Sequence, residues 1–149
     1  MTKKVMVLMG GFSAEREVSL QSGAGIAEAL RRKGYEVTTH DLSDTRQLLA
    51  ELGRSKPDVV FNALHGNWGE DGTVPALLDL LQIPYTHSGM QASCVGMNKY
   101  LCRLIAEKAG LKTAYGRKLS AREFITQGSP VARPFVVKPV SDGSSVGVF

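Results

Sequence analysis

The first part of the chain alternates short apolar runs with stretches whose apolar residues recur at helical spacing. Strands are predicted at 4–9, 35–40, 58–62 and 84–86. Helices are predicted between them, and glycines mark most of their ends. Parallel strands need a long crossover connection, which a helix usually supplies, so this order favours a parallel sheet with helices on both faces. We therefore predict an α/β fold with a doubly wound parallel sheet.

The predicted helices fit such a Rossmann-like sheet. One side of the first helix is formed by residues at helical spacing, namely Val18, Ser22, Gly25, Ile26, Ala29 and Leu30. Because most of these side chains are small, the helix can lie close to the sheet. Asp44 and Gln47 predict a capping box at the start of the second helix, and Gly53 predicts its end. Thr73 is predicted to cap the third helix.

The strand–helix rhythm changes after about residue 89. The later part is predicted to contain a helix at 97–109, a strand at 117–120, a helix at 121–126 and a strand at 134–138. We place a boundary within 89–96 and divide the chain into domains 1–92 and 93–149. The second domain is expected to be incomplete.

Composition narrows the function. The net charge is +4 at pH 7, but Lys and Arg are scattered and form no basic stripe with aromatic residues, so we do not expect nucleic-acid binding. Cys94 and Cys102 have no Cys or His at zinc-ligand spacing and are interpreted as reduced core thiols. The apolar run 5–9 is too short for a signal peptide or a membrane span. We expect a cytoplasmic protein that does not bind membranes.

Two loops follow the first and third predicted strands. The first contains Gly10, Gly11 and Glu15, and the second, 65–72, begins with His65. Ligands in doubly wound folds bind at the carboxyl ends of strands, so both loops are candidate sites, and His65 could donate a hydrogen bond to a carboxylate. The alternatives are a Glu15 that only stabilises a helix N-terminus and a solvent loop whose acidic residues cap the next helix.

The end of the chain predicts a phosphate site. Lys138 closes an apolar run that is interpreted as a buried strand, and Gly143, Ser144 and Ser145 follow in a loop. A buried lysine needs an anionic partner, and the loop offers backbone N–H and hydroxyl donors. The alternative is a lysine that extends into solvent. Lys99, at a predicted helix start, is a second candidate, with an exposed surface lysine as its alternative.

Five motifs together resemble the D-alanine–D-alanine ligases of the ATP-grasp superfamily. They are GGFSAEREVSLQSG at 10–23, LHGNWGEDGT at 64–73, IPYTHSG at 83–89, MNK at 97–99 and VVKPVSDGSSVGV at 136–148. The resemblance spans the whole chain, which would be the N-terminal domain and the start of the ATP-grasp central domain, about half of a family member. Asn98 stands where the family usually has aspartate, which could alter how Lys99 is oriented.

The resemblance implies ligation of two D-alanines for peptidoglycan synthesis, with ATP and Mg²⁺ and an acyl-phosphate intermediate. It implies that Glu15 contacts the ammonium of the first D-alanine and that His65 lies near its carboxylate. Lys99 and Lys138 would contact ATP phosphates. The phosphate loop would include Gly143, Ser144 and Ser145, and its Ser144 would hydrogen-bond toward the catalytic Glu15.

The resemblance also implies what this chain lacks. The metal ligands, an arginine that stabilises intermediates and much of the adenine pocket are expected downstream, so we expect no metal site in this chain and no activity of the chain alone. A homodimer is implied. The alternatives are another ATP-grasp carboxylate–amine ligase, a D-alanine–D-lactate or D-serine ligase, and a non-catalytic α/β binding or dimerisation module.

Overall fold

The computed structural model describes residues 2–143 and 147–149, so the predicted roles of Ser144 and Ser145 fall outside the described residues. The chain divides into two compact units, one ending at Cys94 and the other formed by Val95–Phe149. Each unit is described by itself below. The assignment of 1–92 to substrate and 93–149 to ATP remains a proposal.

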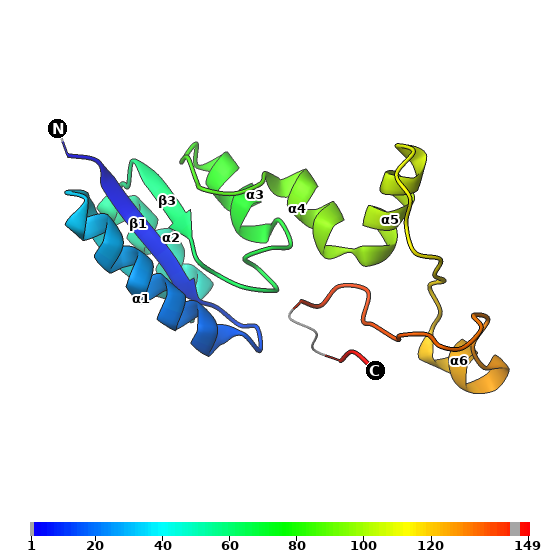
Figure 1. Cartoon of the computed structure of the whole chain (residues 1–149). Helices are drawn as coiled ribbons and strands as arrows, with labels where there is room; N and C mark the ends of the chain where they lie inside the picture. Colours follow the sequence, from blue (N-terminus) through cyan, green and yellow to red (C-terminus); the bar gives the residue numbers. More distant parts are fainter. Residues whose placement is uncertain (1, 144–146) are drawn as a thin grey trace. The chain divides into compact units, whose positions relative to one another are not determined.

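The first unit is built on a parallel sheet of three strands. They are β1 (Lys4–Gly10), β2 (Glu36–Leu42) and β3 (Val59–Asn62), in the order β2-β1-β3. Figure 1 labels β1 and β3. Both pairings of β1 are parallel, with Val5 opposite Val37 on β2 and Val59 on β3. The predicted parallel α/β fold is confirmed, and the central strand is the most buried of the three.

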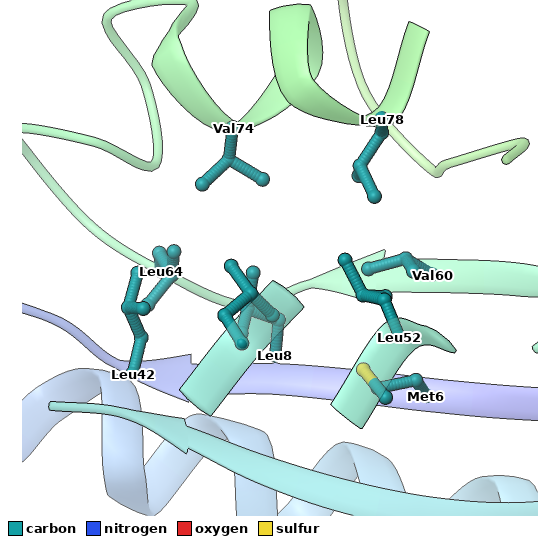
Figure 2. Close-up of a cluster of buried hydrophobic side chains, with 9 residues drawn as sticks. Met6, Leu8, Leu42, Leu52, Val60, Leu64, Val74 and Leu78 are labelled. Carbon is teal, nitrogen blue, oxygen red and sulfur yellow. The ribbon is translucent and has the colours of Figure 1, made fainter. Parts of the chain in front are cut away.

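Helices cover both faces of this sheet, because alternate residues of each strand point to opposite sides. They are α1 (Arg16–Arg32), α2 (Thr45–Ser55) and α3 (Thr73–Leu80). Figure 2 shows the core on one face, where α3 lies over the strands and the side chains come from Met6, Leu8, Leu42, Leu48, Leu52, Val60, Leu64, Val74 and Leu78. The opposite face is covered by α1 through a second cluster, Val7, Ala27 and Ala63.

The close approach of α1 to the sheet depends on small residues, but not on those predicted. Ser19, Gly23 and Ala27 are the buried residues of the helix, whereas Val18, Gly25 and Ala29 of the predicted side are exposed. A Cβ atom added at Gly23 would lie 2.6 Å from Met9 Cβ. Ser19 is fully buried, accepts a hydrogen bond from Gly10 N–H at 2.9 Å and donates one to Ala63 O at 2.7 Å. The hydroxyl of one helical serine therefore joins the carboxyl ends of β1 and β3.

The predicted ends of α2 are right at one side and wrong at the other. Asp44 is the N-cap, as predicted, but its carboxylate accepts from Arg46 N–H at 2.8 Å and does not form the predicted capping box with Gln47. The helix continues past Gly53 and ends at Ser55, where Lys56 takes a left-handed conformation with φ 42°. A glycine inside a helix costs only about 1 kcal/mol, so Gly53 did not have to end it.

The start of α3 also differs from the prediction. Gly72, with φ 92°, is the N-cap, and Thr73 is the first helical residue. The carboxylate of Asp71 accepts the Thr73 N–H at 2.9 Å. Capping by a side chain therefore comes from two residues earlier than predicted.

The predicted fourth strand at 84–86 is reduced to one bridge between Val60 and Tyr85. Val60 N–H donates to Pro84 O at 2.8 Å. Pro84 has no N–H of its own to extend the pairing, so the segment adds a contact to the edge of β3 without forming a strand.

The helix predicted at 97–109 is confirmed as α5 (Lys99–Lys108). A further helix, α4 (Met90–Met97), precedes it where the sequence predicts the domain boundary, and the division between the units falls in this helix. Asn98 is the N-cap of α5 and accepts from Leu101 N–H at 3.0 Å. The helix predicted at 121–126 is confirmed as α6 (Ala121–Gln127), with a capping box between Ser120 and Glu123.

The strands predicted at 117–120 and 134–138 are not present among the described residues. Val137 and Phe149 exchange two backbone hydrogen bonds of 2.8 and 2.9 Å, but Val137 is 41% exposed, so the predicted buried strand is wrong. An isolated pair of extended segments needs further strands or a helix to bury its side chains, and no described residue of the second unit is buried. Cys94 and Cys102 are likewise exposed rather than core thiols.

Candidate functional site

Two glycines stand at the junction of β1 and the loop that leads to α1, and both take a backbone conformation that favours glycine. Gly10 and Gly11 have φ values of 81° and 88°, and a Cβ atom at Gly10 would clash with the carboxylate of Asp41. Glu15 follows as the N-cap residue of α1, and its N–H donates to Ser13 Oγ at 3.2 Å. The loop therefore sets Glu15 at a helix start at the carboxyl end of β1.

Arg16 and Asp41 hold this loop, a pair that the sequence prediction missed. The Asp41 carboxylate comes from the end of β2, and Arg16 Nη1 also donates to Gly11 O at 3.3 Å. The hydrogen bond to Asp41 raises the pKa of the Arg16 guanidinium above its ordinary value, although partial burial opposes it. The available signal was an acidic residue at the carboxyl end of one strand and a basic residue just after the neighbouring strand.

The loop 65–72 is held by its own carboxylates. Glu70 Oε2 accepts from Gly66 N–H at 2.8 Å, and Asp71 accepts from Trp68 N–H at 2.9 Å. Burial raises the pKa of Asp71, but hydrogen bonds from Trp68 and Thr73 outweigh this effect, so the pKa lies below its ordinary value. The alternative interpretation of these two residues, that they serve loop and helix structure, is therefore the one that the contacts support.

The two loops lie side by side at the carboxyl ends of β1 and β3, as predicted. Ser13 Oγ donates to His65 O at 2.7 Å, and Ser22 Oγ lies 3.3 Å from His65 Nε2. A Cβ atom at Gly66 would lie 3.3 Å from Glu15 Oε2. A carboxylate and an imidazole therefore face the same edge of the sheet, where a small zwitterion such as an amino acid could meet both.

An aromatic pair joins the same loops. The rings of Phe12 and Trp68 are 5.3 Å apart at 63°, an edge-to-face arrangement. Trp68 has φ 74°, which is uncommon for a bulky residue. Phe12 is half exposed. The sequence prediction gave neither residue a role.

The side chains of Asn62 and His87 both contact the backbone of the loop 65–72. Asn62 Nδ2 donates to Gly69 O at 2.9 Å, and His87 Nε2 lies 3.0 Å from the same oxygen. These contacts give His87 a structural role in holding the loop.

In the second unit the structure brings Lys99 to the start of the predicted phosphate loop. Lys99 N–H donates to Val140 O at 2.9 Å, and its Nζ donates to Asp142 O. Gly143 is half-buried beside this segment. Lys138 is exposed, which contradicts the prediction of a lysine in a buried strand.

Lys138 lines a cavity of about 960 Å³ within the second unit. This volume is within the range of small-ligand sites. Its wall combines the cations Arg117, Lys118 and Lys138 with the aromatic side chains Tyr115, Phe124 and Phe135. Such a lining suits a ligand with an apolar ring and negative charge.

The described residues contain neither a metal-binding cluster nor a membrane-spanning helix. Within 2–143 and 147–149, no group of three or more His, Cys, Asp or Glu side chains could hold a metal ion. No helix in the part of the chain described is long and apolar enough to cross a membrane.

Comparison with known proteins gives a consistent match. The family described as "D-ala D-ala ligase N-terminus" matches residues 4–56 and 43–88. D-alanine–D-alanine ligase from Parvibaculum lavamentivorans is 53% identical over 147 residues, which are 99% of this chain and 47% of the relative. The chain therefore spans about half the length of the curated relatives it matches.

Solved structures agree. A D-alanine–D-alanine ligase from Bacillus anthracis superposes with a TM-score of 0.78 at 34% identity, covering 99% of this chain and 49% of the other. The ATP complex of the Bacillus anthracis ligase has a TM-score of 0.76 at 31% identity, covering 95% of this chain and 48% of the other. With matching family, sequence and fold, this chain belongs to the D-alanine–D-alanine ligase family.

Proposed function

We propose that the full-length protein joins two D-alanines at the expense of ATP. A carboxylate oxygen of the first D-alanine attacks the γ-phosphorus of ATP, which gives D-alanyl phosphate and ADP. The amine of the second D-alanine then attacks the acyl carbon, phosphate leaves, and the amine loses a proton. The product is D-alanyl-D-alanine for peptidoglycan precursors.

The observation that carries this proposal is the juxtaposition of Glu15 and His65 at one sheet edge in a chain of this family. The Glu15 carboxylate suits the ammonium group of the first D-alanine. A protonated His65 suits the carboxylate of the same molecule. Opposite charges on two adjoining loops favour a zwitterion over a neutral or purely anionic ligand.

In the second unit, Lys99 and Lys138 are proposed to bind ATP phosphates, where fixed positive charge stabilises phosphoryl transfer. The contacts of Lys99 with Val140 and Asp142 support this, because they place its ammonium at the predicted phosphate loop. Gly143, Ser144 and Ser145 are proposed to close over the phosphates, with Ser144 reaching toward Glu15. The cavity lined by Lys138 is proposed for the nucleotide.

Magnesium is part of the proposed activity, but the described residues do not offer a group of ligands that fits it. We therefore assign no step in this chain to a metal. A cytoplasmic location and a homodimer are proposed from the resemblance alone.

The test is an assay of the full-length protein with ATP, magnesium and D-alanine, read by phosphate release and by mass spectrometry of the dipeptide. We expect D-alanyl-D-alanine from D-alanine and none from L-alanine. We expect Glu15→Gln to raise the KM for D-alanine more than the KM for ATP. Phosphate release with another acceptor, and no dipeptide, would show a different ligase.

A further inference from the structure

The His65 imidazole contacts Ser22 of α1, a residue to which no function has been assigned so far. Ser22 Oγ, in the second turn of α1, lies 3.3 Å from Nε2 of His65, which begins the loop after β3. Ser13 fixes the other end of His65 by donating to its carbonyl oxygen at 2.7 Å. Both residues are half-buried, as is Ser13.

The direction of the Ser22–His65 hydrogen bond follows from counting hydrogens. A serine hydroxyl has one hydrogen and two lone pairs. Ser22 Oγ is 2.8 Å from Val18 O and 3.2 Å from Ser19 O, and carbonyl oxygens can only accept. The hydroxyl hydrogen is therefore directed to the helix carbonyls. The lone pairs of Ser22 remain for a donor, and His65 Nε2 can be that donor only if it carries a hydrogen.

We propose that Ser22 is a positioning residue that holds the His65 imidazole with a hydrogen on Nε2 and leaves Nδ1 for the ligand. Within the part of the chain that the structure describes, Nδ1 of His65 makes no hydrogen bond. This inference rests on the proposed function only in naming the ligand, the first D-alanine.

The arrangement has a chemical consequence. Ser22 accepts from Nε2–H in the neutral ring and equally in the imidazolium, because both forms carry that hydrogen. The ring can therefore gain a proton on Nδ1 when a carboxylate approaches, without losing its hold on α1. The neutral ring with hydrogen on Nδ1 is the one form that Ser22 disfavours.

The first measurement is the histidine tautomer. Long-range proton–nitrogen NMR spectra of the ¹⁵N-histidine-labelled chain, recorded with the imidazoles neutral, distinguish Nε2–H from Nδ1–H rings. A His65→Gln variant assigns the signal among the three histidines. We expect the Nε2–H form in the parent, a shift toward a mixture of tautomers in Ser22→Ala, and the parent spectrum in Ser22→Thr.

Ser55→Ala is the matched control. Ser55 Oγ donates to the carbonyl of Glu51, four residues earlier in α2, at 2.7 Å. It thus makes the same bond within a helix as Ser22 makes with Val18, without a histidine partner. We expect its variant to leave the His65 signal unchanged.

The second measurement is steady-state kinetics of the full-length enzyme. Loss of one hydrogen bond that orients a binding group should raise the KM for the first D-alanine roughly 3- to 10-fold. We expect kcat and the KM for ATP to change less than about twofold, since Ser22 touches neither reacting atoms nor nucleotide. Ser22→Thr should restore the KM.

An Nδ1–H ring in the parent, or a His65 spectrum that Ser22→Ala does not alter, would overturn the inference. Absence of dipeptide synthesis by the parent full-length enzyme would overturn the proposed function instead. The NMR result would then still decide the tautomer.

Discussion

Arg16 and Asp41 form a two-point ion pair, with Nη1 2.7 Å from Oδ1 and Nη2 2.6 Å from Oδ2. The pair fastens the first turn of α1 to the carboxyl end of β2, one residue from Glu15. Its side chains are 35% and 40% exposed, so solvent and salt reach it. Its importance is therefore expected in the position of Glu15 more than in overall stability.

A double-mutant cycle tests this role. Arg16→Gln and Asp41→Asn should each raise the KM for D-alanine, and the double variant should raise it by less than the product of the two effects. The coupling should weaken at high salt. Independent, multiplicative effects at every salt concentration would show that the two residues act separately.

A second prediction concerns Gly10, which has a φ of 81°. A methyl group at this position would clash with the Asp41 carboxylate. Gly10→Ala should lower the free energy of unfolding by at least about 1–2 kcal/mol, the cost of a left-handed conformation for a residue with a Cβ. Urea unfolding monitored by circular dichroism measures it.

Gly25→Ala is the matched control for Gly10→Ala. Gly25 lies in α1, and a Cβ atom there would have nothing within 4 Å. Because alanine favours helix over glycine, this variant should be stabilised by about 0.5–1 kcal/mol. Equal effects of the two substitutions would contradict the geometry of the loop.

Lys138→Ala in the full-length enzyme should reduce kcat/KM for ATP by roughly 30- to 1000-fold, as expected for a lysine that neutralises a transferring phosphate. Its melting temperature should stay near that of the parent, since Lys138 is exposed. Lys112→Ala, another exposed lysine of this unit that does not line the cavity, is the control. Unchanged ATP kinetics would support a lysine that merely extends into solvent.

The lowered pKa of Asp71 predicts that the free energy of unfolding decreases at acid pH. Its pKa is lower in the folded chain than its ordinary value, so the unfolded chain binds the proton more tightly. The stabilisation is present above the unfolded pKa of about 3.9 and is lost as the pH falls through the folded pKa.

Asp71→Asn should therefore reduce stability at neutral pH, and the difference from the parent should shrink below about pH 4. Trp68 is the only tryptophan of the chain and lies in the same loop, so its fluorescence reports urea unfolding at each pH. Asp142→Asn, at an exposed residue, is the control. A difference that stays constant with pH would refute the role of the Asp71 charge.

The apolar run at 4–9 was enough to predict β1, which is buried on both faces of the sheet. Helical spacing was enough to predict that α1 exists, but not that Ser19, Gly23 and Ala27 are the residues it buries. The juxtaposition of Glu15 and His65 was also predictable, since parallel strands direct their following loops to one edge. The contacts of Ser13, Ser22 and Asp41 were not, because they depend on which side chains meet across elements.

The strand predicted at 134–138 is absent from the structure, and this error also has a physical reason. An apolar run states that side chains should be buried but not what buries them, and in the described second unit nothing does. The helix predicted at 97–109 was predictable from local spacing, and its structural start follows Asn98, which is the N-cap of α5.

β1 is paired over different lengths with its two neighbours, and this difference affects how the candidate site unfolds. β1 is paired to β2 over seven residues and to β3 over four, and β3 gains only one bridge on its other edge. Partial unfolding should therefore begin at β3, with its amides exchanging hydrogen sooner than those between β1 and β2. Release of β3 breaks the bond from Ser19 to Ala63 and carries His65 away while Glu15 remains on its helix. The lifetime of the paired loops is thus governed by the shortest strand of the sheet.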